Sequence, residues 1–455
     1  MSSLLSTDRS VRESYEADSS GLHLVPDFVA RAESISDVID VVRQATADKS
    51  SITCAGAQTS TTGASITDSG ILLSLRSMDH IGPIDSKGRT ISVGPGALVG
   101  DVKRAVAAEG LLFAPDPTSE EESTVGGAIA CNASGARTFK YGATRRHISA
   151  LKIVTATGDL VEFSRSDLEK NTAGYAFAHD PIDWFIGSEG TLGIVVEAKL
   201  RLLVLPHHVI GIAVLFKEET AALAFVVATR ESDKVAARCI EYFDRKAVEI
   251  ARSANTGAVI PANANSMVYV EEEIHDDLDL CLERWSELID RIAPDFEPLI
   301  FDGDARLRDA RRLRHSIPAT MNERGGTFRG AGGRKVGTDW AVPYRKLGVA
   351  IAVARSIAED RGLEQPVIYG HAGNGHPHEN FIARDAEELR VTEEVVETTL
   401  RHVLSLGGTV AAEHGIGKIK RRWLPLQMNP LQMSMMRAVK RELDPSGILA
   451  PGNIL

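Results

Sequence analysis

Cysteine is scarce in this chain. Its 455 residues include four cysteines, and no two of them form a C-x-x-C pair. Structural zinc sites and iron–sulfur clusters rely on such pairs, so the sequence indicates neither. We expect each cysteine to be a small buried residue; the four are Cys54, Cys131, Cys239 and Cys281.

Long apolar runs and an excess of basic residues are missing as well. The longest apolar runs, such as residues 209–216, are far shorter than the roughly 20 residues of a membrane-spanning helix. Residues 1–20 show no basic stretch followed by an apolar one, so no secretory signal is predicted. A net charge of −11 argues against a nucleic-acid partner. We expect a cytoplasmic protein without a transmembrane segment, and leave peripheral contact with a membrane open.

The length and composition are those of a multidomain globular protein. Hydrophobic residues make up 43% of the chain and charged residues 25%. A chain of 455 residues exceeds one ordinary core, so two or three domains are expected.

Residues 115–151 combine proline, serine, threonine and asparagine with four glycines. Glycine and proline interrupt both helices and strands, so this stretch cannot form one long element. Gly126, Gly127, Gly135 and Gly142 would let the backbone approach a large polar ligand closely. The stretch therefore indicates a surface of backbone N–H groups that receives such a ligand.

Apolar periodicity predicts helices at residues 34–47, 98–109 and 386–406, and a hairpin over 151–163. From residue 206, strands alternate with helices in a regular way: strands at 208–216, 238–244 and 266–273, helices at 218–230, 245–253 and 276–292. This alternation predicts a sheet covered by helices in an α+β domain.

Residues 369–380 contain three histidines within eight positions. Gly373, Gly375 and Pro377 exclude a helix there, so we expect the outer histidines to meet through loop geometry. Neutral imidazoles are good ligands for a borderline divalent ion. Glu413 could add a third ligand.

The glycine-rich stretch at 115–151 resembles the flavin-contacting segment of vanillyl-alcohol-oxidase-type flavoproteins. The resemblance is closest to the branch with D-lactate dehydrogenase, D-2-hydroxyglutarate dehydrogenase and the glycolate oxidase flavin subunit. It implies an α+β fold, with a two-part PCMH-type FAD-binding domain and a ferredoxin-like α+β substrate cap. The implied boundaries are 1–205 for the FAD-binding domain, 206–410 for the cap, and 411–455 for a segment that returns to the FAD-binding domain and completes the active site.

The resemblance also implies noncovalent FAD, because Cys131 and His147 do not fall at the family's linking positions. Residues 55–63 are similar to the family's pyrophosphate loop, although Ala55 replaces an arginine and Gln58 a glycine. A nicotinamide site is a poor alternative, because residues 94–100 have one residue too many for G-x-G-x-x-G. The implied flavin contacts are Gly56, Ala57, Gln58, Thr59, Ser60, Gly63, Pro117, Thr118, Gly126, Gly127, Asn132, Ser134, Gly135, Gly142, Glu189, Gly190, Gly193 and Ile194.

The histidine run is similar to the family pattern HAGDGNxHxN, which is followed later by EHGxG. The resemblance implies a divalent metal, zinc or manganese, on His371, His378 and Glu413. Asn374 and His376 depart from the pattern, and His376 is a competing ligand. The remaining implied roles are His414 as catalytic base, Asn380 as substrate contact and Arg314 as carboxylate anchor, with Arg312 as its rival and Lys335 as a second cation.

These residues predict an FAD- and metal-dependent dehydrogenase of a small D-2-hydroxy acid, with D-lactate as the first guess. D-2-hydroxyglutarate and glycolate remain alternatives, as do a transferase resembling alkyl-glycerone-phosphate synthase and a non-catalytic flavin subunit. Without cluster-binding cysteines, electrons would leave through a quinone, a carrier protein or a partner subunit. A homodimer is compatible with the sequence.

Overall fold

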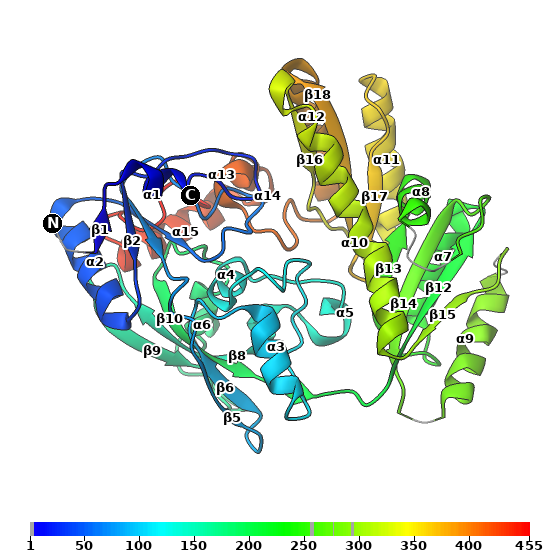
Figure 1. Ribbon diagram of the computed structural model, residues 1–455, viewed down its shortest axis with the longest axis horizontal. Helices are drawn as coiled ribbons and strands as arrows, with labels where there is room; N and C mark the ends of the chain where they lie inside the picture. Colours follow the sequence, from blue (N-terminus) through cyan, green and yellow to red (C-terminus); the bar gives the residue numbers. More distant parts are fainter. Residues whose placement is uncertain (1–3, 255–258, 276, 293–294) are drawn as a thin grey trace. The chain divides into compact units, whose positions relative to one another are not determined.

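The computed structural model describes residues 4–254, 259–275, 277–292 and 295–455, which form two compact units (Figure 1). The first unit contains residues 1–135, 142–205 and 413–455. The second contains residues 136–141 and 206–412. The chain thus leaves and re-enters the first unit twice.

The first unit has a four-stranded sheet in the order β1-β2-β4-β3. Its strands are β1 (Leu5–Ser6), β2 (Phe28–Arg31), β3 (Ile52–Ala55) and β4 (Ile71–Ser74), and β2, β4 and β3 run parallel. Helix α1 (Arg9–Glu13) precedes β2, and α2 (Ile35–Asp48) follows it. A capping box at Ser34 begins α2, which buries its valines against the sheet.

The second sheet of this unit is antiparallel, in the order β5-β6-β10-β8-β9. The strands are β5 (Ile81–Asp85), β6 (Thr90–Val93), β8 (Ile148–Val154), β9 (Leu160–Ser164) and β10 (Ile194–Arg201). Helices α3 (Val99–Ala107) and α4 (Val125–Cys131) share one apolar core with these strands. Smaller elements are β7 (Leu111–Leu112), β11 (Leu203–Val204), α6 (Ile182–Phe185), α13 (Gly417–Lys420), α14 (Leu424–Gln427), α15 (Pro430–Leu443), η1 (Thr144–His147), η2 (Ala176–Ala178) and η6 (Arg421–Trp423).

The second unit is built on a seven-stranded antiparallel sheet, in the order β15-β12-β14-β13-β17-β18-β16. Its strands are β12 (Val209–Phe216), β13 (Ala237–Phe243), β14 (Ser266–Glu273), β15 (Leu299–Asp302), β16 (Gly332–Gly337), β17 (Val367–His371) and β18 (His376–Asp385). Its helices are α5 (Thr138–Tyr141), α7 (Glu219–Glu231), α8 (Arg245–Ser253), α9 (Leu278–Ile292), α10 (Asp304–Gly326), α11 (Leu347–Asp360) and α12 (Ala386–Ser405), with short turns η3 (Arg329–Ala331), η4 (Tyr344–Lys346) and η5 (Ala372–Asn374).

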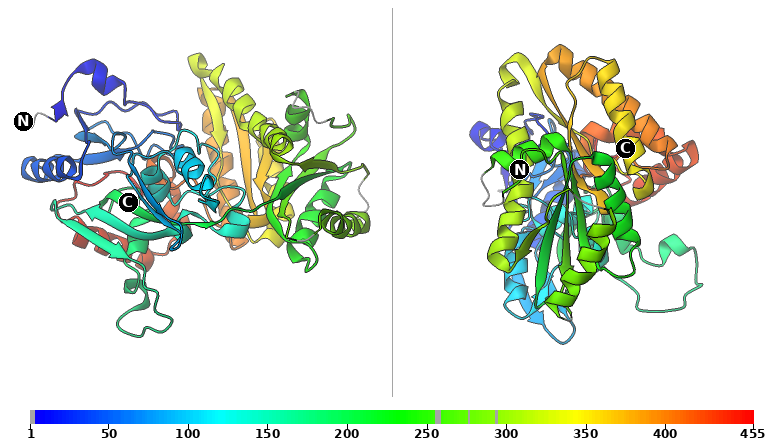
Figure 2. Two further views of the ribbon diagram at one scale, coloured as in Figure 1. Left: turned by 60° about the horizontal axis from the view of Figure 1, so that its bottom comes forward. Right: turned by 90° about the vertical axis from the view of Figure 1, so that its right-hand side faces the viewer.

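Helices cover the sheet on both faces (Figure 2). Leu313 and Ile317 of α10 share a core with Leu215 and Tyr369 on one face. On the other face, the ring of Phe225 in α7 lies 5.7 Å from Phe216 and 6.5 Å from Trp285 of α9. Both faces are therefore apolar, which explains the nearly continuous hydrophobic run of β12.

The α+β architecture agrees with the prediction. The helices predicted at 34–47, 98–109 and 386–406 are present, and so is the alternation of strands and helices predicted over 208–292. One local expectation was wrong. The outer histidines lie on the paired strands β17 and β18, joined by the short turn η5, and not in an open loop. Positive φ angles at Gly370 and Gly375 allow this tight hairpin. Within the described residues, no helix has the length and apolarity needed to cross a bilayer.

Candidate functional site

The loop at residues 56–63 in the first unit offers backbone N–H groups. Within the described chain, the amides of residues 57–61 donate to no protein acceptor, and most of this loop is only half-buried. Gln58 adopts a left-handed conformation with φ 54°. Exposed successive N–H groups suit a diphosphate, so this loop fits the corresponding part of FAD.

Two neighbouring glycines of α4 meet different surroundings. A Cβ on Gly126 would come within 2.7 Å of Pro95, whereas a Cβ on Gly127 would meet only the Thr124 hydroxyl at 3.2 Å. That hydroxyl caps α4 by accepting from the Gly127 amide. Gly126 is therefore required by packing, and Gly127 leaves room for a ligand.

Several predicted flavin contacts use their side chains within the protein. Asn132 Oδ1 accepts from the Arg145 amide at 2.9 Å. The carboxylate of Glu189 accepts from the amides of Ile416 and Gly417, the latter at 2.8 Å. Burial raises the pKa of Glu189, although these hydrogen bonds oppose the shift. The side chains of Asn132 and Glu189 thus accept hydrogen bonds from backbone amides of the first unit.

The other predicted contacts take varied places in the first unit. Pro117 is buried and Thr118 exposed. A Cβ on Gly135 would meet the Asp116 carbonyl at 2.1 Å, and one on Gly193 would meet Ile153. Gly142 and Gly190 have positive φ angles, and Ile194 is buried at the start of β10.

The three histidines of the second unit form a compact cluster. His371 is paired with His376 across the hairpin, and His378 is two residues further along β18. Their ring centroids lie 4.7–5.4 Å apart, and all three side chains are buried. Alternation in β18 places His376 and His378 on the same face. The structure thus brings His376 into the cluster together with the two predicted ligands.

Two of these rings lie next to buried carboxylates, and the carboxylate of Glu241 orients His371 by a hydrogen bond. His371 Nδ1 lies 2.6 Å from Glu241 of β13, and His376 Nε2 lies 3.1 Å from Asp339. Burial alone would raise the pKa of Glu241, but His371 and Arg314 beside it lower the pKa to about 2. A carboxylate on Nδ1–H makes Nε2 the accepting nitrogen of His371, and Arg314 Nη2 lies 3.4 Å from it. The cluster therefore fits a divalent ion on nitrogen ligands.

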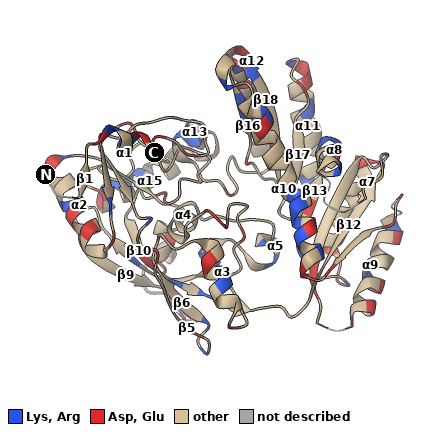
Figure 3. Cartoon of the chain, viewed as in Figure 1, with Lys and Arg blue, Asp and Glu red and all other residues tan. Residues whose placement is uncertain are grey.

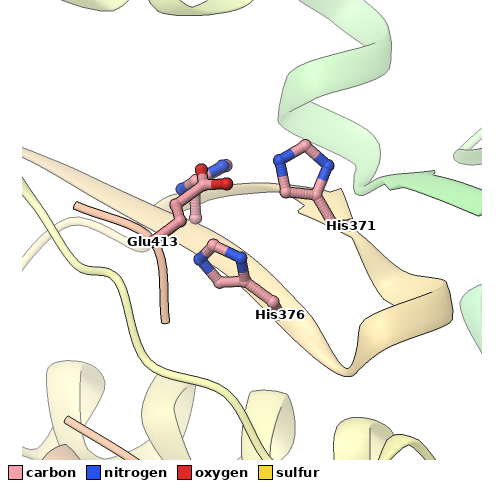
Figure 4. Close-up of side chains that lie close together, drawn as sticks. His371, His376 and Glu413 are labelled. Atoms are coloured by element: carbon pink, nitrogen blue, oxygen red, sulfur yellow. The ribbon is translucent and has the colours of Figure 1, made fainter. Parts of the chain in front are cut away.

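The chain passes from the second unit to the first between Ala412 and Glu413. The Ala412 amide donates to the Asp339 carbonyl at 2.8 Å, which fixes the last residue of the second unit beside Asp339. Within the second unit, one ring nitrogen of each histidine lies within 4.8 Å of the others, and Figure 4 shows the side chains of His371 and His376. Ser134 donates to Glu413 at 3.0 Å, and the half-buried ring of His414 follows in the chain.

Arg314 and its rival Arg312 differ sharply in environment. Both belong to α10, which carries much positive charge (Figure 3). The side chain of Arg314 is 11% exposed, donates to Glu241 at 3.0 Å and lies 3.4 Å from His371 Nε2. Arg312 is 65% exposed and pairs with Asp309. Arg314 is therefore the arginine next to the cluster.

A groove of about 660 Å³ lies between α8, α10 and the strands β17 and β18. Asn380 lines it and donates to the His378 carbonyl at 3.2 Å. Apolar Met321 and Ile382 alternate there with charged Arg324. Glu249 and Glu364 line the groove together with Lys246, Arg324 and Arg384, so its lining carries charges of both signs.

Lys335 on β16 donates to Asn322 at 2.9 Å, and burial lowers its pKa to about 8. Sequence reasoning missed Glu241 and assigned no role to Asp339. The signal for Glu241 was an acidic residue inside a strand of mostly apolar residues, since buried charges need partners.

Comparison with known proteins places the chain in a family. Residues 26–164 match the family described as FAD binding domain, and residues 205–454 match the C-terminal domain of FAD linked oxidases. The chain belongs to the FAD-linked oxidases and is an FAD-dependent oxidoreductase.

Curated relatives cover most of the chain. Glycolate oxidase subunit GlcD of Bacillus subtilis is 29% identical over 94% of this chain and 89% of its own length. D-lactate dehydrogenase of Anaerostipes hadrus is 27% identical with the same coverage. D-2-hydroxyglutarate dehydrogenase of Stutzerimonas stutzeri is 28% identical over 94% of this chain and 91% of its own.

Solved structures share the fold. Alkyldihydroxyacetonephosphate synthase has a TM-score of 0.72 at 18% identity, covering 99% of this chain and 82% of its own. Substrate-bound p-cresol methylhydroxylase has a TM-score of 0.75 at 14% identity, covering 99% and 93%.

Proposed function

We propose that this protein oxidises a small D-2-hydroxy acid to the 2-oxo acid, with D-lactate as the first candidate. The observation that carries the proposal is the cluster of His371, His376 and His378 beside the buried Arg314. The relatives named for glycolate, D-lactate and D-2-hydroxyglutarate support this substrate class.

FAD would lie along the loop at 56–63 and over α4, without a covalent link to the protein. It would accept the two electrons when the α-carbon of the substrate is oxidised. A divalent ion, zinc or manganese, on His371, His378 and Glu413 would lower the pKa of the substrate hydroxyl. His376 would compete with these residues for the ion.

The protein's own groups would then bind the substrate and move its proton. Arg314 holds the substrate carboxylate through a planar fork, and Glu241 fixes that fork from behind. Asn380 contacts the substrate at the groove, and Lys335 adds a second cation. His414 accepts the hydroxyl proton.

A screen of D- and L-2-hydroxy acids with an artificial dye acceptor tests the substrate class. We expect turnover with D-acids and little with L-acids. Anaerobic bleaching of the flavin by the same acid supports a dehydrogenase, whereas no acid would bleach the flavin of a transferase or a non-catalytic subunit. The natural acceptor would be a quinone, a carrier protein or a partner subunit.

His414→Ala tests the base. Because a base acts in the transition state, kcat should fall roughly 10²–10⁴-fold while KM changes little. A kcat close to that of the unaltered protein would move the role to another group.

A further inference from the structure

The loop at residues 56–63 turns its last carbonyl groups toward the carboxyl-terminal segment of the same unit. The Thr62 carbonyl accepts from the Lys418 amide at 2.9 Å. The Gly63 carbonyl accepts from Lys418 Nζ at 3.2 Å, and the Ala64 carbonyl accepts from Asn453 Nδ2 at 2.8 Å. Three successive carbonyls are thus held by protein donors.

The donors are themselves held in place. Lys418 Nζ donates to Asn453 Oδ1 at 2.8 Å, and Asn453 Nδ2 also donates to the Glu189 carbonyl at 3.3 Å. Glu189 accepts from the Gly417 amide next to Lys418. Lys418, Asn453 and Glu189 therefore form one linked support on this side of the loop.

The other side of the loop is tied to the amino-terminal segment. Gln58 Nε2 donates to the Tyr15 carbonyl at 2.9 Å and to the Ser65 carbonyl at 3.4 Å. The guanidinium of Arg31 on β2 lies 5.6 Å from the Tyr15 ring. A left-handed φ is unfavourable at a non-glycine residue, so these contacts stabilise a turn that the backbone alone disfavours.

We propose that Gln58, Lys418 and Asn453 are positioning residues for the FAD diphosphate, which clamp the loop so that its amides face the ligand. A peptide turned the other way would present a carbonyl oxygen and repel an anion. The amides of residues 57–61 donate to no acceptor within the described chain and remain for the phosphates, and the engaged carbonyls of residues 62–64 fix the backbone that follows them. Burial also lowers the pKa of Lys418 to about 8, as expected for a desolvated ammonium that an anion would stabilise.

The inference rests on the assignment of this loop to the diphosphate, so the experiment includes a variant for each claim. The holoenzymes are diluted, and released flavin is read by fluorescence to give the Kd for FAD. Ala57→Asp places a negative charge among the free amides and tests the assignment. Lys418→Met, Gln58→Leu and Asn453→Ala test the clamp.

Lys418→Met should raise the Kd for FAD about tenfold or more, since charged hydrogen bonds are lost. Gln58→Leu and Asn453→Ala should each raise it about threefold to tenfold. Lys418→Arg should recover most of the affinity, because arginine retains the charge and the donors. Lys49→Ala is the matched control. Lys49 is the left-handed residue that caps the end of α2, and its replacement should leave the Kd for FAD unchanged.

If Ala57→Asp retains normal affinity, the assignment of the loop fails. If Ala57→Asp loses FAD but the three clamp variants change the Kd less than twofold, the clamp alone is overturned. Equal losses in Lys418→Met and Lys418→Arg would also overturn it. Should Lys418→Met fail to fold, Gln58→Leu and Asn453→Ala give the same decision.

Discussion

The loop at residues 56–63 and the hairpin at residues 367–385 both prepare a binding site, but with different atoms. The loop offers backbone amides, and its side chains, such as that of Gln58, are turned toward the protein. The hairpin offers imidazole nitrogens, with carboxylates of Glu241 and Asp339 behind them. From this difference we expect that binding of a dinucleotide depends on chain geometry, whereas binding of a metal and its substrate depends on particular side chains.

Removing the metal should separate the two regions most clearly. Chelation should reduce turnover to background, because the substrate hydroxyl then loses its activating ion. The visible flavin spectrum should stay nearly intact, because the loop at 56–63 uses no metal. Metal analysis of the chelated protein and a dye-linked assay check this outcome, and full activity in metal-free protein would contradict it.

Arg314→Ala should have the next largest effect, a rise in KM of roughly 10²-fold. The carboxylate is held in ground state and transition state alike, so kcat should fall less. Arg314→Lys should recover only part of the loss, because an ammonium cannot make a bidentate contact. Arg312→Ala on the same helix is the control, since its side chain is 65% exposed. A rise in KM with Arg312→Ala alone would reassign the anchor.

The elements with strong periodicity could be predicted from the sequence, because burial decides them. Helix α2 buries Val38, Val41, Val42 and Ala45 at helical spacing, and Ser34 marks its start. The α+β class followed from such patterns, and the flavin family followed from the resemblance of the glycine-rich stretch to known flavoproteins.

The hairpin of the histidines could not be predicted in the same way. Gly373, Gly375 and Pro377 favour a loop in any local account, and only pairing with distant strands makes the segment a hairpin. The partner carboxylate Glu241 lies 130 residues from His371 in the chain. No local pattern reports such a contact. The roles of the site residues remain predictions for the experiments described above.

Glu379 tests how the second unit tolerates buried charge. Its side chain is fully buried and accepts from Trp340 Nε1 at 3.2 Å. Burial raises its pKa from 4.5 to about 7. The folded protein therefore keeps a proton that the unfolded chain releases between about pH 4.5 and pH 7, and the free energy of unfolding falls as pH rises through this window.

The loss should amount to roughly 3 kcal/mol between pH 4.5 and pH 8, as a shift of this size implies. Glu379→Gln should remove this part of the pH dependence, because a neutral amide replaces the ionisable group. Urea unfolding of both proteins at four pH values measures the difference. Glu387→Gln, at an exposed position, is the control and should leave the profile unchanged. Parallel profiles for Glu379→Gln and the unaltered protein would show that this carboxyl does not titrate in the window.

The smallest effects are expected from substitutions in α4, where the neighbouring glycines Gly126 and Gly127 form a matched pair. Gly126→Ala places a Cβ within 2.7 Å of Pro95, so the free energy of unfolding should fall by about 1–3 kcal/mol. Gly127→Ala meets only the Thr124 hydroxyl at 3.2 Å and gains helix propensity, so stability should change by less than about 1 kcal/mol. The added methyl group of Gly127→Ala would instead occupy the space in which we expect the flavin, so FAD binding should weaken severalfold. Unfolding in urea and flavin release on dilution measure the two quantities separately. If both variants lost stability and affinity in parallel, Gly127 would be a packing glycine like its neighbour, and α4 would not define the flavin surface.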